Sequence, residues 1–382
     1  MPEPSRLAHV LALLALAPAL ALAACAPTPA PTRPPAAPAP PPEAPPAPAA
    51  APAPATPAGS AVPPLSPPVA VKTGSTGLVG DSGFFAALAR GYFQEEGLDV
   101  ELVPLRSSTD ALPALAVGEL DFASSSVDGS LLNALARDIT FRIVGFNAII
   151  PPTDTTGGMV VRQDHVDSGR YRDPKDLRGM TLGLSAPGGL GQVWTERVLA
   201  MGGLSLDDVQ FTTLSFPDTP VALANKAIDA AYLVEPFISV AETQGAAKAV
   251  MLNGEIYPGL VAQVQLLSPV FAERQPEAAR RYVTAWLRGQ RDFYHTFVKN
   301  EGGREEFYQV LQQYTPIKDA RLYPRMTTHL IDVNSEMDPT TLNELQDYYL
   351  RYGTQLQRVD LSKVIDRSYG QYAVERLGRI TP

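Results

Sequence analysis

The sequence predicts an α/β protein with two Rossmann-like lobes, a two-strand hinge between them and a set of C-terminal helices. Three observations lead to this fold class. Short apolar strands alternate with helices, and this alternation runs through the chain twice. A segment of the first run recurs in the second. Two extended runs lie where a chain would cross from one lobe to the other and return.

The first run of strands and helices covers about residues 69–146. A short apolar strand is followed by a helix with apolar residues at helical spacing, and then by an alternating strand. Because single helices separate the strands, the sheet is expected to be parallel, with helices on its faces. The expected elements are strands 69–73, 98–103, 120–123 and 140–146 and helices 84–93, 110–118 and 129–137.

The second run repeats this order, with strands at 180–184, 209–214 and 229–233 and helices at 192–201, 219–226 and 236–243. Residues 114–123 align with 222–231, and five of these ten positions are identical. Each copy runs from the end of a predicted helix into the predicted strand that follows it. The repeat therefore favours two similar lobes of about 100 residues each.

Extended runs at 157–162 and 259–267 are expected to form the hinge, because a chain that leaves one lobe and later returns crosses twice. The folded domain then covers 69–382. Its first lobe combines about 69–156 with 268–382, and its second lobe covers about 157–267. Helices expected at 276–298, 304–314, 339–356 and 361–377 pad the first lobe and brace the hinge.

The amino end resembles an export signal. An apolar stretch at 7–24 meets small residues and then Cys25, the only cysteine. Such a stretch before a cleavage point is typical of a secretory signal, here 1–24. A cysteine directly after the small residues resembles the lipobox of bacterial lipoproteins, which implies lipidation of Cys25. The alternatives are a transmembrane helix, for which the stretch is marginal in length and interrupted by Pro18, and a buried free thiol.

Residues 25–68 form a Pro/Ala-rich linker after the lipidated cysteine. The 43 residues from 26 to 68 hold 19 of the 38 prolines and only two charged residues, so they cannot bury enough apolar surface to fold. Such a segment favours extended polyproline II and is predicted to be a disordered spacer. A PxxP partner motif is the alternative reading.

Charge and cysteine content exclude several classes. The chain carries 31 Lys and Arg against 40 Asp and Glu, a net charge of −9, which argues against nucleic-acid binding. A single cysteine excludes a disulfide scaffold and cysteine-rich metal sites. The four histidines have no ligand spacing, so no metal site is predicted.

Five motifs together resemble one family. They are residues 91–102 (GYFQEEGLDVEL), 118–123 (GELDFA), 173–179 (DPKDLRG), 234–237 (VEPF) and 360–366 (DLSKVID). The chain is similar to the nitrate/sulfonate/taurine and thiamine-pyrimidine binding proteins of ABC importers over about residues 69–378. The resemblance implies the type II periplasmic binding protein fold and hinge closure around a small solute. It also implies delivery to permease and ATPase subunits, without catalysis or cofactor.

With the lipid anchor, this resemblance places the protein on the extracytoplasmic face of the cell membrane, in the periplasm or at the cell surface. A monomer is expected. In open α/β sheets, ligands bind outside the carboxyl ends of the strands, so the loops there are expected to line the solute cleft. The predicted site residues are Ser75, Thr76, Asp81, Ser82, Phe84, Ser124, Ser125 and Ser126 from the first lobe, and Ser185, Gly188, Gly189, Leu190, Gly191, Trp194, Asp218, Glu235 and Tyr257 from the second.

Different chemistry is expected of these residues. Serine, threonine and aspartate side chains supply hydroxyls and a carboxylate, while the helix that opens at 185–191 favours an acceptor or anion. Aromatic side chains such as Trp194 could stack on a flat solute. Each has an alternative: Gly188 and Gly189 as a tight turn, the serine run as a solvated loop, and Trp194 as core.

The charges bear on the solute. Near the predicted loops the basic residues are Lys72 and Arg106, whereas Asp81, Asp128, Asp218 and Glu235 are acidic. This balance favours a nitrogen-rich or hydroxylated aromatic, such as a pyrimidine-type vitamin precursor or a flavin-like ring. The helix start at 185–191 keeps sulfonate, taurine and nitrate open.

Catalysis finds little support in the motifs. The sequence lacks GxxxxGK[ST], HExxH and a complete GxGxxG, and residues 183–187 fail GxSxG at the last position. Two alternatives stay open: an enzyme on the same scaffold, like the pyrimidine-synthase branch of the family, and an extracytoplasmic sensor. The family's synthase branch uses Cys-rich segments, and the expected folded part holds no cysteine.

Overall fold

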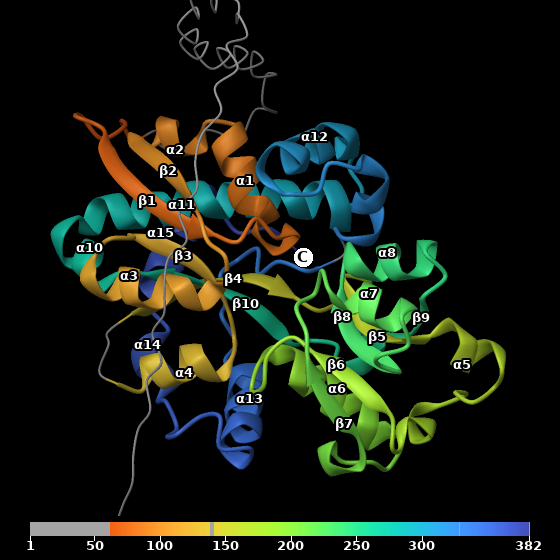
Figure 1. The fold of residues 1–382 in the computed structure, drawn as a ribbon. Helices are drawn as coiled ribbons and strands as arrows, with labels where there is room; N and C mark the ends of the chain where they lie inside the picture. Colours follow the sequence, from red (N-terminus) through yellow and green to blue (C-terminus); the bar gives the residue numbers. More distant parts are fainter. Residues whose placement is uncertain (1–61, 138–140, 328, 382) are drawn as a thin grey trace, which may run out of the picture. The chain divides into compact units, whose positions relative to one another are not determined.

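The computed structural model describes residues 62–137, 141–327 and 329–381. The expected leader, Cys25 and most of the proline-rich linker lie outside the described residues. None of the helices in the described ranges is long and apolar enough to span a membrane. The described part holds two five-stranded sheets with helices packed around them (Figure 1).

The first sheet has the strand order β2-β1-β3-β10-β4. Its strands begin and end close to the predicted positions, although β3 and β4 each extend three residues further. The bounds are β1 Val69–Ser75, β2 Leu98–Pro104, β3 Phe122–Ser126, β4 Arg142–Ile149 and β10 Val261–Leu267.

The second sheet has the order β7-β6-β8-β5-β9, which places corresponding strands at corresponding positions. One of its strands, β9, was not predicted. The bounds are β5 Gly157–Arg162, β6 Thr181–Leu184, β7 Gln210–Thr213, β8 Ala230–Val234 and β9 Ala247–Leu252.

The expectation of parallel sheets is wrong for one strand in each sheet. β10 runs antiparallel to β3 and β4, and β5 runs antiparallel to β8 and β9. Both strands follow a hinge crossing. A chain that arrives from the other lobe enters the sheet at the edge where the parallel strands end, so it must run in the opposite direction.

The predicted helices are present with changes at their ends, and the expected helix 84–93 is divided between Ser82–Ala89 and Tyr92–Glu95. The short helices Gln163–Asp167, Asn253–Ile256 and Pro269–Arg274 were not predicted. The expected helix 276–298 ends at Phe293 and continues as a π-helical segment at Tyr294–Val298, and the expected helix 361–377 is split in two. The α-helices are α1 Ser82–Ala89, α2 Tyr92–Glu95, α3 Ala111–Val117, α4 Gly129–Leu135, α5 Gln163–Asp167, α6 Leu190–Met201, α7 Thr219–Ala224, α8 Phe237–Thr243, α9 Asn253–Ile256, α10 Pro269–Arg274, α11 Pro276–Phe293, α12 Arg304–Tyr314, α13 Thr340–Arg351, α14 Leu361–Val364 and α15 Arg367–Leu377.

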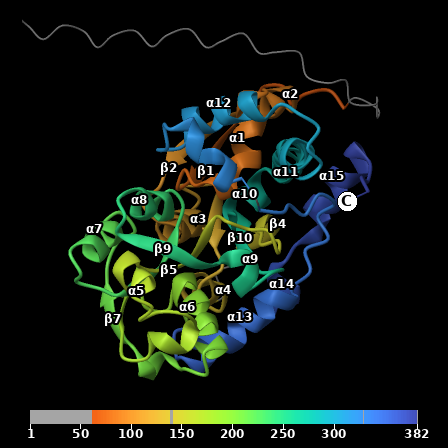
Figure 2. The same cartoon turned by 90° about the vertical axis from the view of Figure 1, so that its right-hand side faces the viewer.

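The long helix α11 packs directly on α1 (Figure 2). Gly289 makes this possible, because a Cβ there would collide with the carbonyl oxygen of Gly83. Tyr282 of α11 stacks on Phe122 of β3 with ring centroids 3.6 Å apart. Helix α11 therefore shares a core with the first sheet.

The two hinge crossings are hydrogen-bonded to each other. The backbone N–H of Ile150 donates to Leu260 over 2.9 Å, and Gly259 donates back to Ile150 over 2.6 Å. A third segment joins them, because Leu330 forms a bridge to Ile149 with both backbone hydrogen bonds present. The runs predicted as the hinge, 157–162 and 259–267, instead lie mainly within the two sheets, as β5 and β10. The contacts between the crossings are at residues 149–150 and 259–260, with an additional strand-like contact from Leu330.

The internal repeat recurs in the atomic contacts. Asp121 accepts a hydrogen bond from the backbone N–H of Lys72, in the middle of β1, over 2.8 Å. The aligned Asp229 accepts one from the N–H of Thr181, at the start of β6, over 3.0 Å. Both carboxylates therefore fasten a neighbouring strand at the edge of the sheet away from the hinge.

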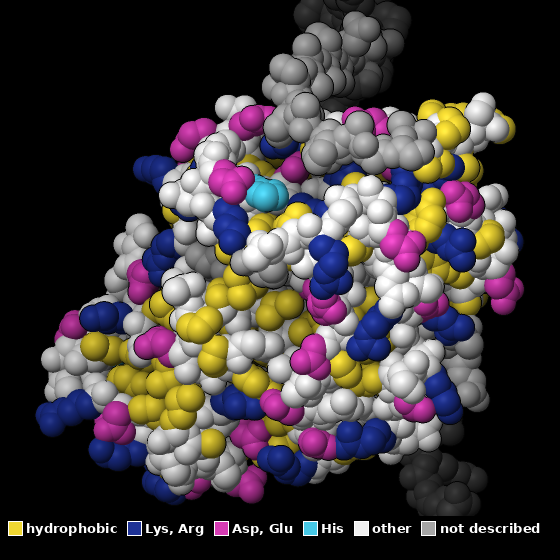
Figure 3. Space-filling view, turned by 180° about the vertical axis from the view of Figure 1, so that it is seen from behind, with side chains coloured by type: hydrophobic (Ala, Val, Ile, Leu, Met, Phe, Trp, Pro, Cys, Tyr) yellow, Lys and Arg dark blue, Asp and Glu magenta, His cyan; other side chains and the backbone are white. Residues whose placement is uncertain are grey.

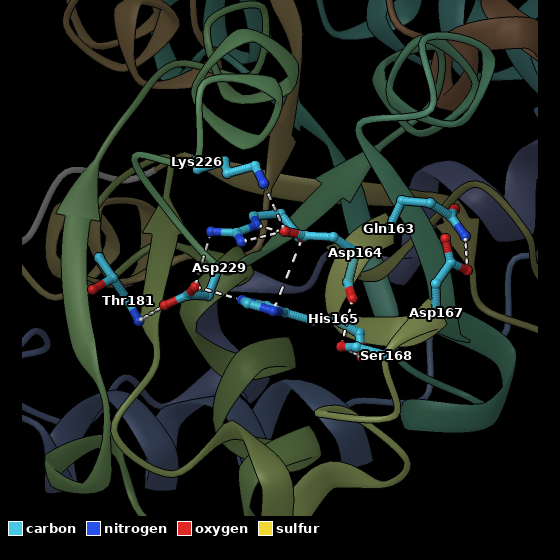
Figure 4. A network of polar contacts seen from close by, with 9 residues as sticks. Gln163, Asp164, His165, Asp167, Ser168, Thr181, Lys226 and Asp229 are labelled. Carbon is cyan, nitrogen blue, oxygen red and sulfur yellow. Dashed lines mark hydrogen bonds and ion pairs between the residues drawn. The ribbon is translucent and has the colours of Figure 1, made fainter.

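The second copy carries a larger network around Asp229 (Figure 4). His165 Nε2 lies 2.7 Å and Arg162 Nη1 3.3 Å from Asp229 Oδ1. Asp164 accepts two hydrogen bonds from Arg162, and Lys226 lies 3.0 Å from it. Each polar group of this network has a partner of opposite character, which indicates a structural role.

The repeat also explains an unusual backbone at Lys226. The aligned residue Gly118 has φ of 75°, a left-handed conformation that ends α3, and Lys226 adopts φ of 60° at the same place after α7. Lys226→Gly is therefore expected to raise the free energy of unfolding by about 1 kcal/mol. Loss of the exposed ion pair with Asp164 offsets only a few tenths of that. Urea unfolding followed by tryptophan fluorescence measures the change.

Gly118→Ala serves as the matched control. Besides the positive φ, a Cβ at Gly118 would lie 2.9 Å from a Val270 methyl carbon. This substitution is expected to lower the free energy of unfolding by at least about 1 kcal/mol. Loss of stability in Lys226→Gly, or none in Gly118→Ala, would contradict the structural equivalence of the two positions.

Charges of both signs are interspersed over the back of the molecule, and no single-sign stripe crosses this face (Figure 3).

Candidate functional site

The candidate site lies where the parallel strands of both sheets end. β4 leads into the hinge and β5 leads out of it. Since β3 is antiparallel to β10, as β4 is, β3 ends at the hinge-facing edge of its sheet. β8 is antiparallel to β5, so it also ends at the hinge-facing edge. The loops after β1, β3, β6 and β8 therefore border the seam between the sheets.

A buried carboxylate is the centre of the first-sheet half of this site. Asp81 immediately precedes α1 and is only 1% exposed. Its Oδ2 accepts hydrogen bonds from Ser75 Oγ over 2.5 Å and from Ser124 Oγ over 2.8 Å. Asn147 Nδ2 lies 3.3 Å from Oδ1. The structure thus brings three predicted site residues, Ser75, Asp81 and Ser124, into one group.

Burial raises the pKa of Asp81 from 3.8 to about 6, while the hydrogen bonds from Ser75, Ser124 and Asn147 act in the opposite direction. All three partners are neutral donors. Because no cation faces the carboxylate in this group, its ionised form is costly near neutral pH. A buried acid kept in this state marks a candidate functional group.

Two members of this group were missed by the sequence reasoning. Asn147 is on β4, and Gln265, whose Oε1 lies 3.3 Å from Asn147 Nδ2, is on β10. Asn147 Oδ1 and Gln265 Nε2 have no hydrogen-bond partner among the described residues, although both atoms are buried. The available signal was a pair of glutamines, Gln263 and Gln265, in an otherwise apolar strand. We call Ser75, Asp81, Ser124, Asn147 and Gln265 the Asp81 cluster.

Other predicted residues of the first lobe lie outside the Asp81 cluster. Phe84 is 2% exposed and packs against Phe85 and Phe93 in the hydrophobic core, so the structure assigns it to core packing. Ser82 is fully buried and donates to the carbonyl of Val79. Ser125 donates to the carbonyl of Ser126, and Thr76 and Ser126 remain partly exposed at the ends of their strands.

The start of α6 forms the other half of the candidate site. Gly189 is its N-cap, and no acidic residue lies in the first turn. Gly188 has φ of +73° and donates its N–H to Gln192 Oε1 over 2.9 Å, so this glycine makes the tight turn considered from the sequence. Ser185, Leu190 and Gly191 border the same turn. The free amino end of α6 favours an acceptor or an anion.

The tryptophan near this turn belongs to the core. Trp194 is 2% exposed and lies parallel to Tyr232, with ring centroids 5.8 Å apart. It also meets the predicted residue Tyr257 edge-on at 6.1 Å. Tyr232 hydroxyl and the Asn253 side-chain amide are 3.0 Å apart. The rings pack beneath the α6 turn in the core. Trp194 is therefore a core residue, the alternative considered from the sequence.

Two predicted acids differ in their surroundings. Asp218 is exposed and accepts a hydrogen bond from Ser215 Oγ over 2.5 Å, as a turn residue before α7. Glu235 is 4% exposed, accepts from the backbone and hydroxyl of Ser239, and lies 3.1 Å from Arg325 Nε. Burial raises the pKa of Glu235, and the Arg325 guanidinium acts against this shift. Sequence reasoning missed Arg325, which comes from the distant segment Ala320–Arg325.

Two cavities lie elsewhere. One, of about 650 Å³, is lined by Phe146, Val261 and the segments around Ile331 and Ile380, and one of about 610 Å³ lies near Val359. Neither borders a predicted site residue. The Asp81 cluster and the α6 turn are therefore supported by topology and polar chemistry rather than by an enclosed cavity.

The described residues contain no group of three or more His, Cys, Asp or Glu side chains placed to hold a metal ion. What the site offers is a carboxylate with hydroxyls and amides on one sheet, and a helix amino end with aromatic support on the other. Such groups bind a polar solute by hydrogen bonds and charge.

Comparison with known proteins identifies the class. The described fold is that of type II periplasmic binding proteins. The alkanesulfonate-binding protein SsuA of Xanthomonas axonopodis pv. citri, solved with MOPS, is 19% identical with a TM-score of 0.62, over 80% of this chain and all of that one. The nitrate-binding protein NrtA of Synechocystis PCC 6803 is 15% identical with a TM-score of 0.68, over 81% of this chain and 89% of that one.

A desulfurization enzyme, DszB, has the same fold, with 16% identity and a TM-score of 0.58 over 81% of this chain and 99% of that one. No curated protein matches the chain in sequence. A family model described as NMT1/THI5 like matches residues 81–296, more than half of the chain. The chain belongs to the NMT1/THI5-like family, as the motifs in the sequence indicate.

Proposed function

We propose that this protein is the solute-binding component of an ABC importer and that it binds its solute at the seam between the two sheets. The buried Asp81 carboxylate is the observation that carries this proposal. It lies at the strand ends that face the seam, at a cost to stability that no neighbouring cation offsets. Family membership and the solved binding proteins of the same fold support the same conclusion.

The two halves of the site suit a solute that has hydrogen-bond donors at one end and an acceptor or anionic group at the other. The Asp81 cluster provides a carboxylate and hydroxyl groups, which accept hydrogen bonds from amino groups. The amino end of α6 has N–H groups and a positive dipole end, which favour an acceptor. Arg325, a cation at the seam, is already held by Glu235 and by Glu242 at 3.0 Å. We therefore favour a nitrogen-rich or hydroxylated heterocycle, with sulfonate, taurine and nitrate as alternatives at α6.

We further propose that Cys25 is lipidated and that the linker up to residue 68 tethers the folded part to the extracytoplasmic face of the membrane. Where the described part begins, Arg281 Nη1 donates to the carbonyl of Pro63 over 2.6 Å, and Leu65 N–H donates to Glu96. The chain is therefore fastened to the first lobe a few residues before β1. In this proposal the binding protein is a monomer, and its partners are the permease and ATPase subunits of the importer.

The second candidate function is an enzyme on the same scaffold. The fold of the desulfurization enzyme favours this alternative, because it shows that one scaffold carries both binding and catalysis. Against it, residues 62–382 contain no cysteine, the residue type on which the Cys-rich synthase branch depends.

A thermal-shift titration of the purified chain tests the proposal. The panel contains an aminopyrimidine, riboflavin, taurine, an alkanesulfonate and nitrate. One compound is expected to raise the melting temperature with a saturating concentration dependence, because a solute that binds only the folded state stabilises it. An absence of any shift with all five compounds, or conversion of one into a product detected by mass spectrometry, would count against solute binding without turnover.

A further inference from the structure

Helix α13 connects the C-terminal part of the first lobe with the second lobe. In both Figures 1 and 2 it lies beside α6. Glu344 accepts a hydrogen bond from the Tyr257 hydroxyl and lies 3.5 Å from Arg197 Nη2. The Arg197 guanidinium in turn lies 3.2 Å from the centre of the Tyr257 ring. Burial, and then the Glu344 carboxylate, raise the pKa of Tyr257 to about 12, so its hydroxyl remains a donor.

The end of α13 repeats this connection two turns later. Tyr352 donates its hydroxyl to Glu196 of α6 over 2.5 Å, and Arg351 lies 3.5 Å from the same carboxylate. Gly188 of the α6 turn faces Thr354, whose methyl carbon would lie 2.7 Å from a Cβ on that glycine. The turn proposed to bind solute therefore packs directly against the segment that follows α13.

α13 itself is fastened to the first lobe. Tyr349 donates its hydroxyl to the carbonyl of Val127 over 3.1 Å, and Asn133 donates to the carbonyl of Thr354 over 2.8 Å. Thr341 accepts from the N–H of Val261, at the start of β10, over 3.1 Å. Since α13 is fixed on this side, rotation of the second lobe about the hinge must separate Glu344 from its partners on α6 and α9.

A second connection involves Arg325. Its guanidinium reaches two acids of the second lobe, Glu235 at 3.1 Å and Glu242 at 3.0 Å. Its backbone carbonyl accepts a hydrogen bond from Thr155, within the first hinge crossing, over 2.7 Å. The Glu235 side chain is only 1% exposed, so removal of the Arg325 guanidinium with the lobes in this arrangement would leave a buried carboxylate without this cation.

We infer that Glu344 and Arg325 are positioning residues that set the angle between the lobes in the absence of solute. Each is held on the first-lobe side and reaches charged or hydroxyl groups of the second. Neither belongs to the Asp81 cluster. Only the consequence of these contacts for binding rests on the proposed function. If the solute binds at the seam, these contacts hold the α6 turn and Glu235 in place before it arrives.

The test measures an interlobe distance without solute, so its outcome does not depend on the proposed function. The full chain carries Cys25→Ser, and labels are attached at Val117→Cys on α3 and Val221→Cys on α7, positions that are 67% and 56% exposed. Pulsed electron spin resonance then records the distance distribution. A narrow distribution is expected for this parent protein.

Glu344→Gln and Arg325→Gln, alone and together, are the test variants. Asp347→Asn and Arg321→Gln are the matched controls, because Asp347 is on the same helix and pairs with Arg358, and Arg321 is in the same segment as Arg325 and pairs with Asp319. Both control pairs lie within the C-terminal part. The double test variant is expected to raise the fraction of molecules outside the parent's distance range roughly tenfold, with a smaller change in each single variant.

A broadened or longer distance in the test variants, with controls that match the parent, supports the inference. A double variant whose distribution coincides with the parent would overturn it, and so would an equal change in the controls. Thermal melting of each variant separates this result from unfolding. Glu344→Gln alone remains informative if the Arg325 variants do not fold, because the Glu344 side chain is 48% exposed.

Discussion

Asp81→Asn is expected to make the protein more stable at neutral pH and to weaken solute binding. The folded-state pKa of about 6 lies above the ordinary 3.8, so folding disfavours the ionised carboxylate. The difference corresponds to about 3 kcal/mol once the group is ionised in both states. Asparagine keeps an oxygen that accepts from Ser75 and Ser124, and its amide can donate to the unpartnered Oδ1 of a reoriented Asn147.

The stability difference between Asp81→Asn and the parent is expected to depend on pH. Because the folded pKa is raised, the contribution of Asp81 to stability is fully present below about pH 4 and is lost as the pH rises through 6. The variant should therefore be about as stable as the parent at pH 4 and more stable by up to about 3 kcal/mol at pH 8. Urea unfolding at the two pH values measures both differences.

Solute binding should change in the opposite direction. A charge-assisted hydrogen bond to the solute is worth about 1.5–3 kcal/mol, so its removal should weaken binding about 10- to 100-fold. Asp347→Asn is the control, because Asp347 is an exposed residue of α13, pairs with Arg358 and is not among the predicted site residues. If Asp81→Asn lost stability at pH 8 and bound solute as the parent does, Asp81 would be a structural residue.

His329→Leu is expected to remove a large loss of stability in acid. His329 is 2% exposed, its Nε2 has no hydrogen-bond partner among the described residues, and its ring stacks on Phe293 with centroids 4.2 Å apart. Burial lowers its pKa from 6.5 to about 3. The sequence reasoning assigned this histidine to surface or satisfied core, and the structure places it in the core without a partner for Nε2.

Because the folded pKa is lowered, stability is lost as the pH falls below 6.5. The loss reaches about 2 kcal/mol by pH 5. The leucine variant should therefore be within about 1 kcal/mol of the parent at pH 8 and about 2 kcal/mol more stable than it at pH 5. Phe293→Leu should instead lower stability at both pH values alike. A parallel pH profile for His329→Leu and the parent would show that His329 is protonated in the folded state.

The fold was largely predictable because its sheets arise from local patterns. Apolar runs with helical spacing between them located nearly all strands, and the repeat at 114–123 and 222–231 proved to be structural. β9 was missed because its sequence, AKAVML, lies between two helices without clear alternation. The direction of β5 and β10 was missed because strand direction depends on the hinge, which is a property of the whole chain.

The candidate site was predictable only where its residues lie in loops after strands. Ser75, Asp81 and Ser124 fall in such positions, and the structure brings them together. Asn147, Gln265 and Arg325 come from other elements, and their proximity depends on tertiary packing. Phe84 and Trp194 show the opposite case: an aromatic beside a predicted loop is buried in the core, because helical spacing alone does not tell which face a side chain takes.

Native mass spectrometry of the purified chain, incubated with the five-compound panel, shows whether the protein binds a solute without changing it. We expect a complex of one chain with one solute, loss of this complex in Asp81→Asn but not in Asp347→Asn, and recovery of the solute chemically unchanged after denaturation. A chain that retains no panel compound, or that releases an altered one, would contradict this expectation.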